Sequence, residues 1–271
     1  MNGWPLYYHP FARAAICMTD NPVLIFPDWP APQPVRAVFT TRQGGVSMGP
    51  FASLNMGRSG GDNAAAVSEN RRRVFAAAGT PAEPCWIRQV HGACVVRMPG
   101  AAPEPEADAS FTTEAGVVCA VQAADCLPVL FCDEAATVVA AAHAGWRGLA
   151  AGVLERTIEA LPVPPGRLLA WLGPAIGPEA FEVGEEVREA FARHSPYALQ
   201  AFRAAASPGK YLADLFALAR MRLQAAGVQR VYGGGLSTHA DAARFYSYRR
   251  DGATGRMAAL IWIGPEQRRD G

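Results

Sequence analysis

The chain has 271 residues and half of them are hydrophobic, so it can bury a substantial core in one large domain or two modest ones. Its 25 lysines and arginines against 24 aspartates and glutamates give no electrostatic case for a nucleic-acid partner, and we interpret the run Arg71–Arg73 as the solvated face of a helix. The six cysteines form no Cys-x-x-Cys pair, which indicates no disulfide framework and favours a reducing, cytoplasmic location without a membrane partner.

The first segment of the chain, residues 1–17, has no periodicity or turn pattern of its own. Arg13 is its one basic residue and it lacks a sustained apolar core, so it fits neither a signal peptide nor a membrane span. We expect these residues to be disordered or to lie upstream of a native start at Met18, with a single domain over residues 18–271.

Apolar or β-branched runs between turn residues predict the strands, and helical periodicity with end signals predicts the helices. Strands are expected at Val35–Thr40, Cys85–Val90, Cys94–Met98, Val117–Val121, Leu127–Cys132, Thr137–His143, Leu168–Leu172, Val231–Gly233 and Met257–Ile263. Helices are expected at Asn63–Ala78, Leu149–Leu161, Gly184–Arg193 and Tyr211–Ala226. Because several strands are apolar on both faces and do not strictly alternate with helices, we predict a mixed α/β layered sandwich.

The segment from Ala140 to Gly148 carries a histidine where a predicted strand gives way to a helix. Gly145 and Gly148 allow the backbone to approach closely there, and the start of a helix attracts anions through its free N–H groups. A single histidine at a strand end is more often structural, but the two glycines and Arg147 favour a functional role for His143.

Two further segments have the same character. Cys126 stands before an apolar strand, and the neighbouring Asp125 places a charge where burial is costly unless both groups have partners. His91 follows the short strand predicted to end at Val90. Two imidazoles and one thiol, from His91, Cys126 and His143, form a three-ligand zinc set with a fourth position free for water or substrate, which is typical of a catalytic metal site.

Polar residues in two other segments are candidates for substrate binding. Arg42 lies in a glycine turn after a strand and has the fork geometry that grips phosphate, and Asn55 could hydrogen-bond a sugar or a base. The segment Phe245–Gly252 contains Arg249 and two tyrosines spaced by two. On a strand these tyrosines share one face, which suits either a core or a wall for a flat ring.

Taken in order, these segments resemble the laccase-domain (YfiH-type) family, once labelled multicopper polyphenol oxidases and later zinc-dependent purine nucleoside phosphorylases. The matching motifs, between about Arg36 and Ile263, are Thr-Thr-Arg-Gln-Gly-Gly, Gln-Val-His-Gly, Ala-Asp-Cys-Leu-Pro-Val, Ala-His-Ala-Gly-Trp-Arg-Gly, Leu-Gly-Pro-Ala-Ile-Gly-Pro, Phe-Glu-Val-Gly and Tyr-Ser-Tyr-Arg-Arg-Asp-Gly-x-Thr-Gly-Arg. The resemblance implies one α/β/β/α sandwich domain with the two histidines and the cysteine as zinc ligands. Where the family usually has a Cys-Thr pair, this chain has Ser237-Thr238, so any role of that thiol is absent.

The resemblance also implies phosphorolysis of adenosine, inosine and methylthioadenosine, with adenosine deamination as a secondary activity. The partners would be a small-molecule nucleoside and phosphate, bound by a monomer or a small homo-oligomer. We expect Arg42, Arg147 and Arg249 to bind phosphate or transition-state charge, and Asn55 to bind the substrate. Asp125 would support the metal ligands or act as a general base.

Three other functions are compatible with the same residues. A copper-dependent polyphenol oxidase could use the two histidines and the cysteine, but the five histidines of the chain include no His-x-His pair for a multinuclear cluster. A cysteine amide hydrolase that edits cell-wall precursors, as some relatives do, would make Cys126 the nucleophile and His143 its base, oriented by Asp125. A structural zinc site needs a fourth protein ligand, for which His239 is the available candidate.

Overall fold

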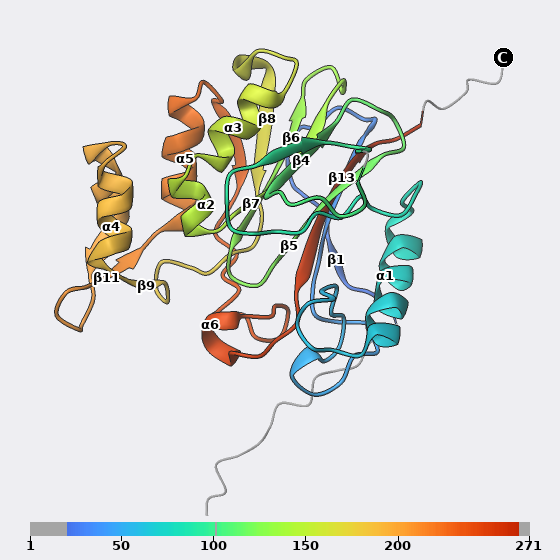
Figure 1. Ribbon diagram of the computed structural model, residues 1–271, viewed down its shortest axis with the longest axis horizontal. Helices are drawn as coiled ribbons and strands as arrows, with labels where there is room; N and C mark the ends of the chain where they lie inside the picture. The colour runs from blue at the N-terminus through green and yellow to red at the C-terminus, as the bar shows by residue number, and fades with distance from the viewer. Residues whose placement is uncertain (1–20, 101, 266–271) are drawn as a thin grey trace, which may run out of the picture.

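The computed structural model describes residues 21–100 and 102–265, so the predictions made for residues 1–17 and for Met18 lie outside the described residues. Its elements stack in four layers, with two β-sheets facing each other and helices on the outside (Figure 1). This arrangement confirms the predicted α/β/β/α sandwich.

The larger sheet is mixed. Its strands follow the order β12-β8-β6-β7-β4-β3, and only the outermost pair at each edge is parallel. The register places Pro128 opposite His143, so β6 begins immediately after Cys126. The strands are β3 (Val95–Arg97), β4 (Ala109–Thr112), β6 (Leu127–Asp133), β7 (Val139–Ala144), β8 (Leu168–Leu172) and β12 (Arg230–Gly233).

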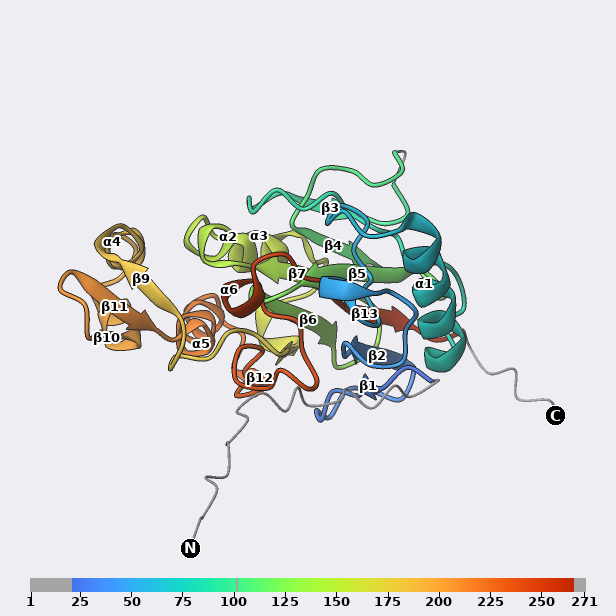
Figure 2. The ribbon, with the colours of Figure 1, turned by 90° about the horizontal axis from the view of Figure 1, so that it is seen from below.

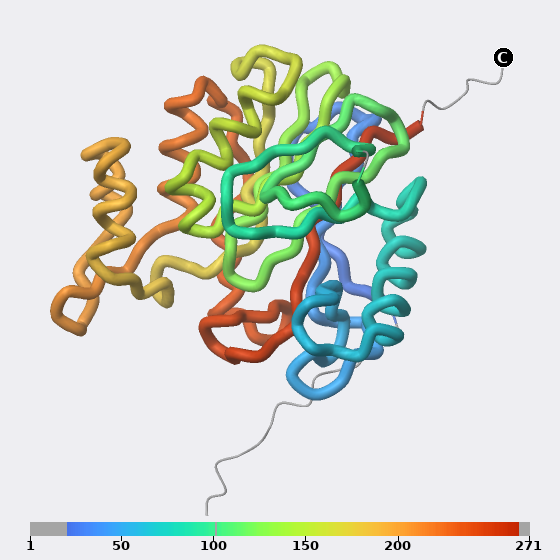
Figure 3. The backbone as a smooth tube through the Cα atoms, in the orientation of Figure 1, coloured from blue at the N-terminus to red at the C-terminus, as the bar shows by residue number. Residues whose placement is uncertain are grey.

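The smaller sheet is antiparallel, with the strand order β1-β2-β13-β5. Strand β13 comes late in the chain and pairs with β2 on one side and β5 on the other (Figure 3). Because β5 continues into β6 through residues 124–126, this turn connects the two sheets. The strands are β1 (Leu24–Ile25), β2 (Val35–Thr40), β5 (Val118–Ala123) and β13 (Met257–Ile263).

Helices cover the outer face of each sheet. Helices α2, α3 and α5 pack on the larger sheet and α1 packs on the smaller one, while α4 and a three-stranded sheet extend beyond α5 (Figure 2). None of the helices in the described part of the chain combines the length and the apolar character needed to cross a bilayer. The helices are α1 (Ala64–Ala78), α2 (Trp146–Ala150), α3 (Val153–Ala160), α4 (Glu185–Ala192), α5 (Leu215–Ala225) and α6 (Tyr248–Asp251). Short 3-10 turns lie at Gly49–Phe51, Pro165–Arg167 and Pro196–Ala201. The three-stranded sheet consists of β9 (Glu182–Gly184), β10 (Phe202–Ala204) and β11 (Lys210–Ala213).

Alternate side chains bury both faces of each sheet. In β6, Val129 and Phe131 belong to the core under the helices, whereas Leu130 and Cys132 belong to the core between the sheets. In β13, Leu260 packs in the core beneath α1, and its neighbours in the strand face the other sheet. Strands that are buried on both faces have continuous apolar sequences, as the sequence shows here.

Two predicted helices were wrong in their bounds. Lys210–Ala213 is a strand paired with β9 and β10, and helix α5 begins only after it. Asp214 separates the two elements, because its side chain accepts a hydrogen bond from the Ala217 backbone N–H and caps the helix. The helix predicted from Leu149 is divided by Gly152, whose φ of 89° is not helical.

The segment Cys85–Val90 is not a strand, contrary to the prediction. It makes only isolated bridges, one from Cys85 to Cys119 and one from Arg88 to Glu106. The short strands β1, β4, β9, β10 and β11 were not predicted, because two to four residues are too few to show a period. The other predicted strands, and the helices α1 and α4, are confirmed to within two residues.

Phe131 tests the packing of the larger sheet against its helices. Its side chain is 0 % exposed, so Phe131→Ala should lower the free energy of unfolding by about 3–5 kcal/mol through lost apolar contacts and a cavity. Tyr197→Ala, at a side chain that is 74 % exposed, should change it by no more than about 0.5 kcal/mol. Urea unfolding followed by circular dichroism measures both values, and equal losses in the two variants would contradict this core assignment.

Candidate active site

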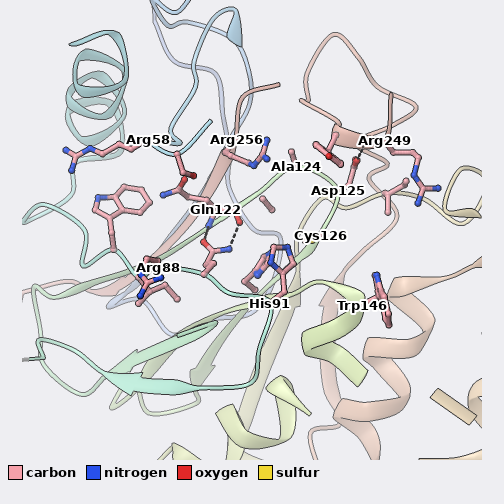
Figure 4. A pocket seen from close by; sticks show the side chains of 18 of the residues that line it. Arg58, Arg88, His91, Gln122, Ala124, Asp125, Cys126, Trp146, Arg249 and Arg256 are labelled. Atoms are coloured by element: carbon pink, nitrogen blue, oxygen red, sulfur yellow. Dashed lines mark hydrogen bonds between the residues drawn. The ribbon is translucent and has the colours of Figure 1, made fainter. Parts of the chain in front are cut away.

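Three side chains converge beside the turn that connects the sheets. The candidate ligand atoms of His91, Cys126 and His143 all lie within 4.8 Å of one another. The two imidazole rings are 4.9 Å apart between centroids, and their planes cross at 81°. His91 lies on the loop before β3, Cys126 lies at the end of the turn before β6, and His143 lies in β7 (Figure 4). The structure therefore brings the predicted ligand set together from three separate segments.

The carboxylate of Asp108 holds two of the three ligands in place. Its Oδ1 accepts a hydrogen bond from the His91 backbone N–H at 2.9 Å, and its Oδ2 accepts from those of Val90 and Gly92 at 3.2 and 2.6 Å. The same Oδ1 lies 2.9 Å from Nδ1 of His143. One fully buried carboxylate thus fixes both the loop that carries the first histidine and the ring of the second.

The charge of Asp108 decides which nitrogen of His143 is free. Burial raises the pKa of Asp108, but hydrogen bonds from His143 and from the Gly92 and Val90 backbone, with the charge of His143, hold this pKa below its ordinary value. The carboxylate is therefore ionised, and we assign the proton on Nδ1 of His143 to this hydrogen bond. Nε2 is left as the ligand atom, because a metal-binding histidine donates its other N–H to such a partner.

Cys126 and His143 polarise each other. Burial raises the pKa of the Cys126 thiol, but the charge of His143 and hydrogen bonds from both histidines lower it to about 6. Burial lowers the pKa of His143, but the charge of Cys126 and the hydrogen bond to Asp108 raise it to about 9. At neutral pH the two groups therefore form a thiolate–imidazolium pair; the thiolate is the form that binds metals, and a metal ion would take the place of the proton on Nε2 of His143.

Two glycines after β7 leave room for the ligands. A Cβ atom on Gly145 would lie 2.7 Å from Sγ of Cys126, and one on Gly148 would lie 2.7 Å from the carbonyl oxygen of Gly92, next to His91. Both distances are shorter than any ordinary carbon contact. The predicted close approach of the backbone at Gly145 and Gly148 is confirmed. Glycine at these positions leaves space for the Cys126 thiol and for the loop that carries His91.

Asp125 shapes the turn that carries Cys126. Its φ of 89° lies in the left-handed region, which is costly for a residue with a side chain. Its carboxylate accepts hydrogen bonds from the hydroxyl groups of Thr238 and Ser247 at 2.6 and 3.0 Å, and from the Arg249 backbone N–H at 2.7 Å. These bonds tie the turn to α6 and to the loop before it, and they offset the backbone strain.

A cavity of about 700 Å³ lies beside the three ligands, within the size range of small-molecule sites. Figure 4 shows its side chains reaching in from both sheets and from α2 and α6. The wall combines cationic, aromatic and amide groups. These are Arg58, Arg71, Arg88, Arg249 and Arg256, then Trp86, Trp146, Phe181 and Tyr248, then Gln89 and Gln122.

Three of the predicted catalytic or substrate residues, Asp125, Cys126 and Arg249, line this cavity. The Arg249 guanidinium donates to the carbonyl oxygens of Ala180 and Glu182, at 3.3 and 2.9 Å. Arg147 is not among the lining residues and stacks on the neighbouring Trp146 ring, with Cζ 4.4 Å from the ring centroid.

The structure does not bring Arg42 or Asn55 to the cavity wall. The guanidinium of Arg42 donates to the carbonyl oxygens of Ala52 and Ala242. Asn55 is 1 % exposed and its side chain bonds to the backbone of residues 57 and 256 and to the Asp62 carboxylate. Both side chains fasten the loops around the smaller sheet.

The run Arg71–Arg73 is not uniformly solvated, contrary to the prediction. Arg71 is 3 % exposed, stacks on Trp86 with Cζ 3.9 Å from the ring centroid, and donates to the Met56 carbonyl oxygen. Only Arg72 is largely exposed. The buried positions of α1 follow helical spacing through Val67, Arg71 and Val74, and this pattern could have identified the inward-facing arginine.

Asp108 is a residue of the candidate site that sequence reasoning missed. It precedes the short strand β4 in the sequence Ala107-Asp108-Ala109, just as Asp125 precedes β6. The same argument about the cost of a buried acid would have selected it, had β4 been recognised as a strand. His239, the candidate fourth ligand, is not part of the cluster, so the described residues supply three ligands and favour an open site over a closed structural one.

The chain was compared with known families and proteins. A family model described as multi-copper polyphenol oxidoreductase laccase matches residues 36–264. The chain belongs to this family. Among similar members, a purine nucleoside phosphorylase of Pseudomonas aeruginosa is 56 % identical over 241 residues, which cover 88 % of this chain and 97 % of the relative. Purine nucleoside phosphorylase YfiH of Escherichia coli is 54 % identical over 244 residues, which cover 89 % and 98 %.

Solved structures agree with this membership of the laccase-like family. A crystal structure of a Neisseria meningitidis protein has a TM-score of 0.85 and 52 % identity, covering 89 % of this chain and 99 % of that one. The structure of YlmD from Geobacillus stearothermophilus has a TM-score of 0.81 and 36 % identity, covering 86 % and 93 %. These two proteins therefore share the four-layer fold of this chain.

Asp108→Asn tests whether the carboxylate orients the ligands of this laccase-like site. We expect Zn²⁺ affinity to fall about 10- to 100-fold, because a neutral amide no longer fixes the His143 ring and the His91 loop together. Competition with a chelating dye measures the affinity. Asp133→Asn is the matched control, because Asp133 is equally buried but its hydrogen bonds lie in the β6–β7 turn. Equal weakening in both variants would show that Asp108 acts only through general stability.

Gly145→Ala tests the need for space beside the thiol. The added methyl group, 2.7 Å from Sγ of Cys126, must displace the sulfur, so we expect metal affinity to fall at least about tenfold. Gly166→Ala is the control, because nothing lies within 4 Å of a Cβ atom there. Metal content after dialysis, measured by mass spectrometry, separates the two variants. Full metal content in Gly145→Ala would contradict this geometry.

Proposed function

We propose that this chain is a purine nucleoside phosphorylase that acts on adenosine, inosine and methylthioadenosine. The observation that carries the proposal is the cluster of His91, Cys126 and His143 at the wall of a cavity large enough for a nucleoside. The relatives named purine nucleoside phosphorylase support it, because this chain spans nearly their whole length at more than half identity.

Zn²⁺ fits the donor set of the proposed site. Two imidazoles and a thiolate are donors that zinc takes in catalytic sites, and three protein ligands leave one position for a reactant. When bound, the ion supplies a Lewis acid that orients and polarises phosphate or water. A blue-copper centre adds a weak axial methionine, and no methionine lines this cavity among the described residues. A multinuclear copper cluster needs more histidines than the two that meet here.

The reaction exchanges one bond at C1′ of the ribose for another. The bond from C1′ to N9 of the purine breaks and its electron pair stays with the purine, while a phosphate oxygen bonds to C1′. The proton of HPO₄²⁻ passes to the purine, so free base and ribose 1-phosphate balance the substrates. The protein has to hold both reactants in line and keep phosphate beside the sugar, which a cavity with cationic and aromatic walls is suited to do.

The residues predicted from the sequence take different parts in this proposal. Asp125 positions Cys126, because both of its carboxylate oxygens already accept hydrogen bonds from protein donors. Arg249 contributes its backbone N–H to that carboxylate and closes one end of the cavity. We assign no substrate contact to Arg42, Asn55 or Arg147, whose side chains do not line the cavity.

Deamination of adenosine is proposed as a secondary activity of the same site. The sequence lacks the His-x-Glu and Pro-Cys-x-x-Cys arrangement of nucleobase deaminases, so the reaction would depend on the open position beside His91, Cys126 and His143. Ammonia release from adenosine without phosphate is its readout.

We further propose that the enzyme acts in the cytoplasm on small-molecule nucleoside and phosphate, as a monomer or small homo-oligomer. The cysteines in the described part of the chain are all free, which agrees with a reducing compartment. A catalytic thiolate also requires such a compartment, because oxidation would remove it as a ligand.

Phosphate-dependent cleavage tests the proposed function. Zinc-loaded protein given inosine and phosphate without oxygen should release hypoxanthine and ribose 1-phosphate in equal amounts. Cys126→Ala should lower the rate more than about 100-fold, because it removes a metal ligand. Cys94→Ala, at an exposed cysteine outside the cavity, should leave the rate unchanged. Chromatography of the released bases measures the rates of wild type and of both variants.

Two other results would point away from phosphorolysis. Oxygen uptake with a phenol after copper loading, without base release, would favour the oxidase. Loss of an amide-hydrolysing activity on alkylation of Cys126, with zinc retained, would favour the cysteine hydrolase.

A further inference from the structure

Arg256 lines the cavity between Arg58 and Arg249 in the view of Figure 4, and the sequence argument did not select it. It immediately precedes β13, whose first residue, Met257, pairs with Ala123 at the end of β5. The turn that carries Cys126 begins at the next residue of the chain. Figure 4 shows the Arg256 side chain directed toward Ala124 and Asp125. The guanidinium therefore lies at the side of the cavity where the metal ligands are.

The structure holds Arg256 in one orientation. Its Nη1 donates to the carbonyl oxygens of Thr254 and Gly255 at 2.9 and 3.0 Å, and its backbone N–H donates to Oδ1 of Asn55 at 2.8 Å. A Cβ atom on Gly57 would lie 2.8 Å from Cγ of Arg256, so the absence of a side chain there makes room for its stem. A guanidinium fixed in this way loses little freedom when it binds a ligand.

The remaining edge of this guanidinium is unused. Nε and Nη2 of Arg256 have no hydrogen-bond partner among the described residues, and no carboxylate there lies within ion-pair distance. Nε and Nη2 together form the edge that meets two oxygens of a phosphate or carboxylate at once. Burial lowers the pKa of Arg256, against the charges of Cys126, Asp125 and Tyr248, but a guanidinium remains protonated at neutral pH.

The other arginines of the cavity are already engaged. Arg58 pairs with Glu104, and Arg88 pairs with Glu106 at 2.6 Å. Arg71 directs Nε and Nη2 to one backbone carbonyl oxygen. Arg249 uses only Nη1 for its two carbonyl oxygens, as Arg256 does, but it is exposed where Arg256 is half-buried, and it lies at the far end of the view from Arg58 in Figure 4. Arg256 is thus the guanidinium that combines a half-buried place with a free bidentate edge.

We propose that Arg256 binds the phosphate co-substrate through Nε and Nη2, next to His91, Cys126 and His143. This inference rests on the proposed phosphorolysis and names the residue that receives its anionic reactant. Phosphate held there carries its negative charge into a site walled by protein, where one fixed guanidinium interacts far more strongly than in water. The same contact stabilises the phosphate oxygen as it bonds to C1′ and the purine leaves.

The test is the Michaelis constant for phosphate. Arg256→Gln removes the charge and keeps much of the side-chain length, so KM for phosphate should rise about 10- to 100-fold, the loss expected for charge-assisted hydrogen bonds. KM for inosine should change much less, because the nucleoside binds through other walls. Arg256→Lys keeps the charge but lacks the forked pair of donors, so its KM for phosphate should lie between those of wild type and Arg256→Gln. Arg193→Gln is the matched control, because it removes one charge from an exposed arginine that pairs with Glu189 outside the cavity.

A second measurement separates this inference from the proposed function. Phosphate alone should raise the thermal midpoint of zinc-loaded wild-type protein and of Arg193→Gln, but not that of Arg256→Gln, with equal zinc content in all three. If wild type shows this shift but no phosphorolysis, the anion site stands and the proposed function fails. If wild type cleaves inosine and Arg256→Gln keeps its KM for phosphate and its thermal shift, the inference about Arg256 is overturned alone.

Discussion

The site depends on one buried carboxylate. Asp108 bonds to the ring of His143 and to three consecutive backbone N–H groups around His91, so two metal ligands from separate segments share one anchor. A buried charge is tolerated only when it is well partnered, and these four bonds provide the partners. The same bonds keep the acid ionised, which fixes the tautomer of His143 and leaves Nε2 for a metal. The same hydrogen bonds therefore fix both the positions of the two histidines and the protonation of the His143 ring.

The layered architecture explains where this anchor is placed. The turn at residues 124–126 passes from one sheet to the other, so Cys126 lies at the junction of the two. The strand β7 brings His143 from the larger sheet, while β13 brings Arg256 from the smaller. Both faces of each sheet are apolar and packed, which makes the strands rigid and confines polar groups to their ends. The cavity at this junction is therefore lined by the thiol and imidazole of the larger sheet on one side and by the guanidinium that precedes β13 of the smaller sheet on the other.

Much of this arrangement could be predicted from residue patterns, and the failures have identifiable causes. The long apolar strands and the helices α1 and α4 were predictable because their periods and end signals agree. The ligands could be chosen because His91 and His143 lie near glycines at turns, and because Cys126 follows the charged Asp125 just before an apolar strand. Asp108 could not be chosen so easily, because its strand is too short to show alternation. Arg256 ends the quoted Tyr-Ser-Tyr-Arg-Arg-Asp-Gly-x-Thr-Gly-Arg motif, but its place beside the turn at Cys126 depends on the pairing of β13 with β5, which no local pattern reveals.

The position of β13 has a consequence for how the protein is made. This strand lies between β2 and β5, which emerge from the ribosome long before it. Until residues 257–263 have been synthesised, β2 and β5 have no neighbour to join them, and each presents unpaired backbone groups. The smaller sheet can close only after residues 257–263 have been synthesised, in contrast to β6 and β7, which pair with each other as soon as both have emerged. A nascent chain thus contains His91, Cys126 and His143 long before β13 is made, whereas Arg256 is added only together with that strand.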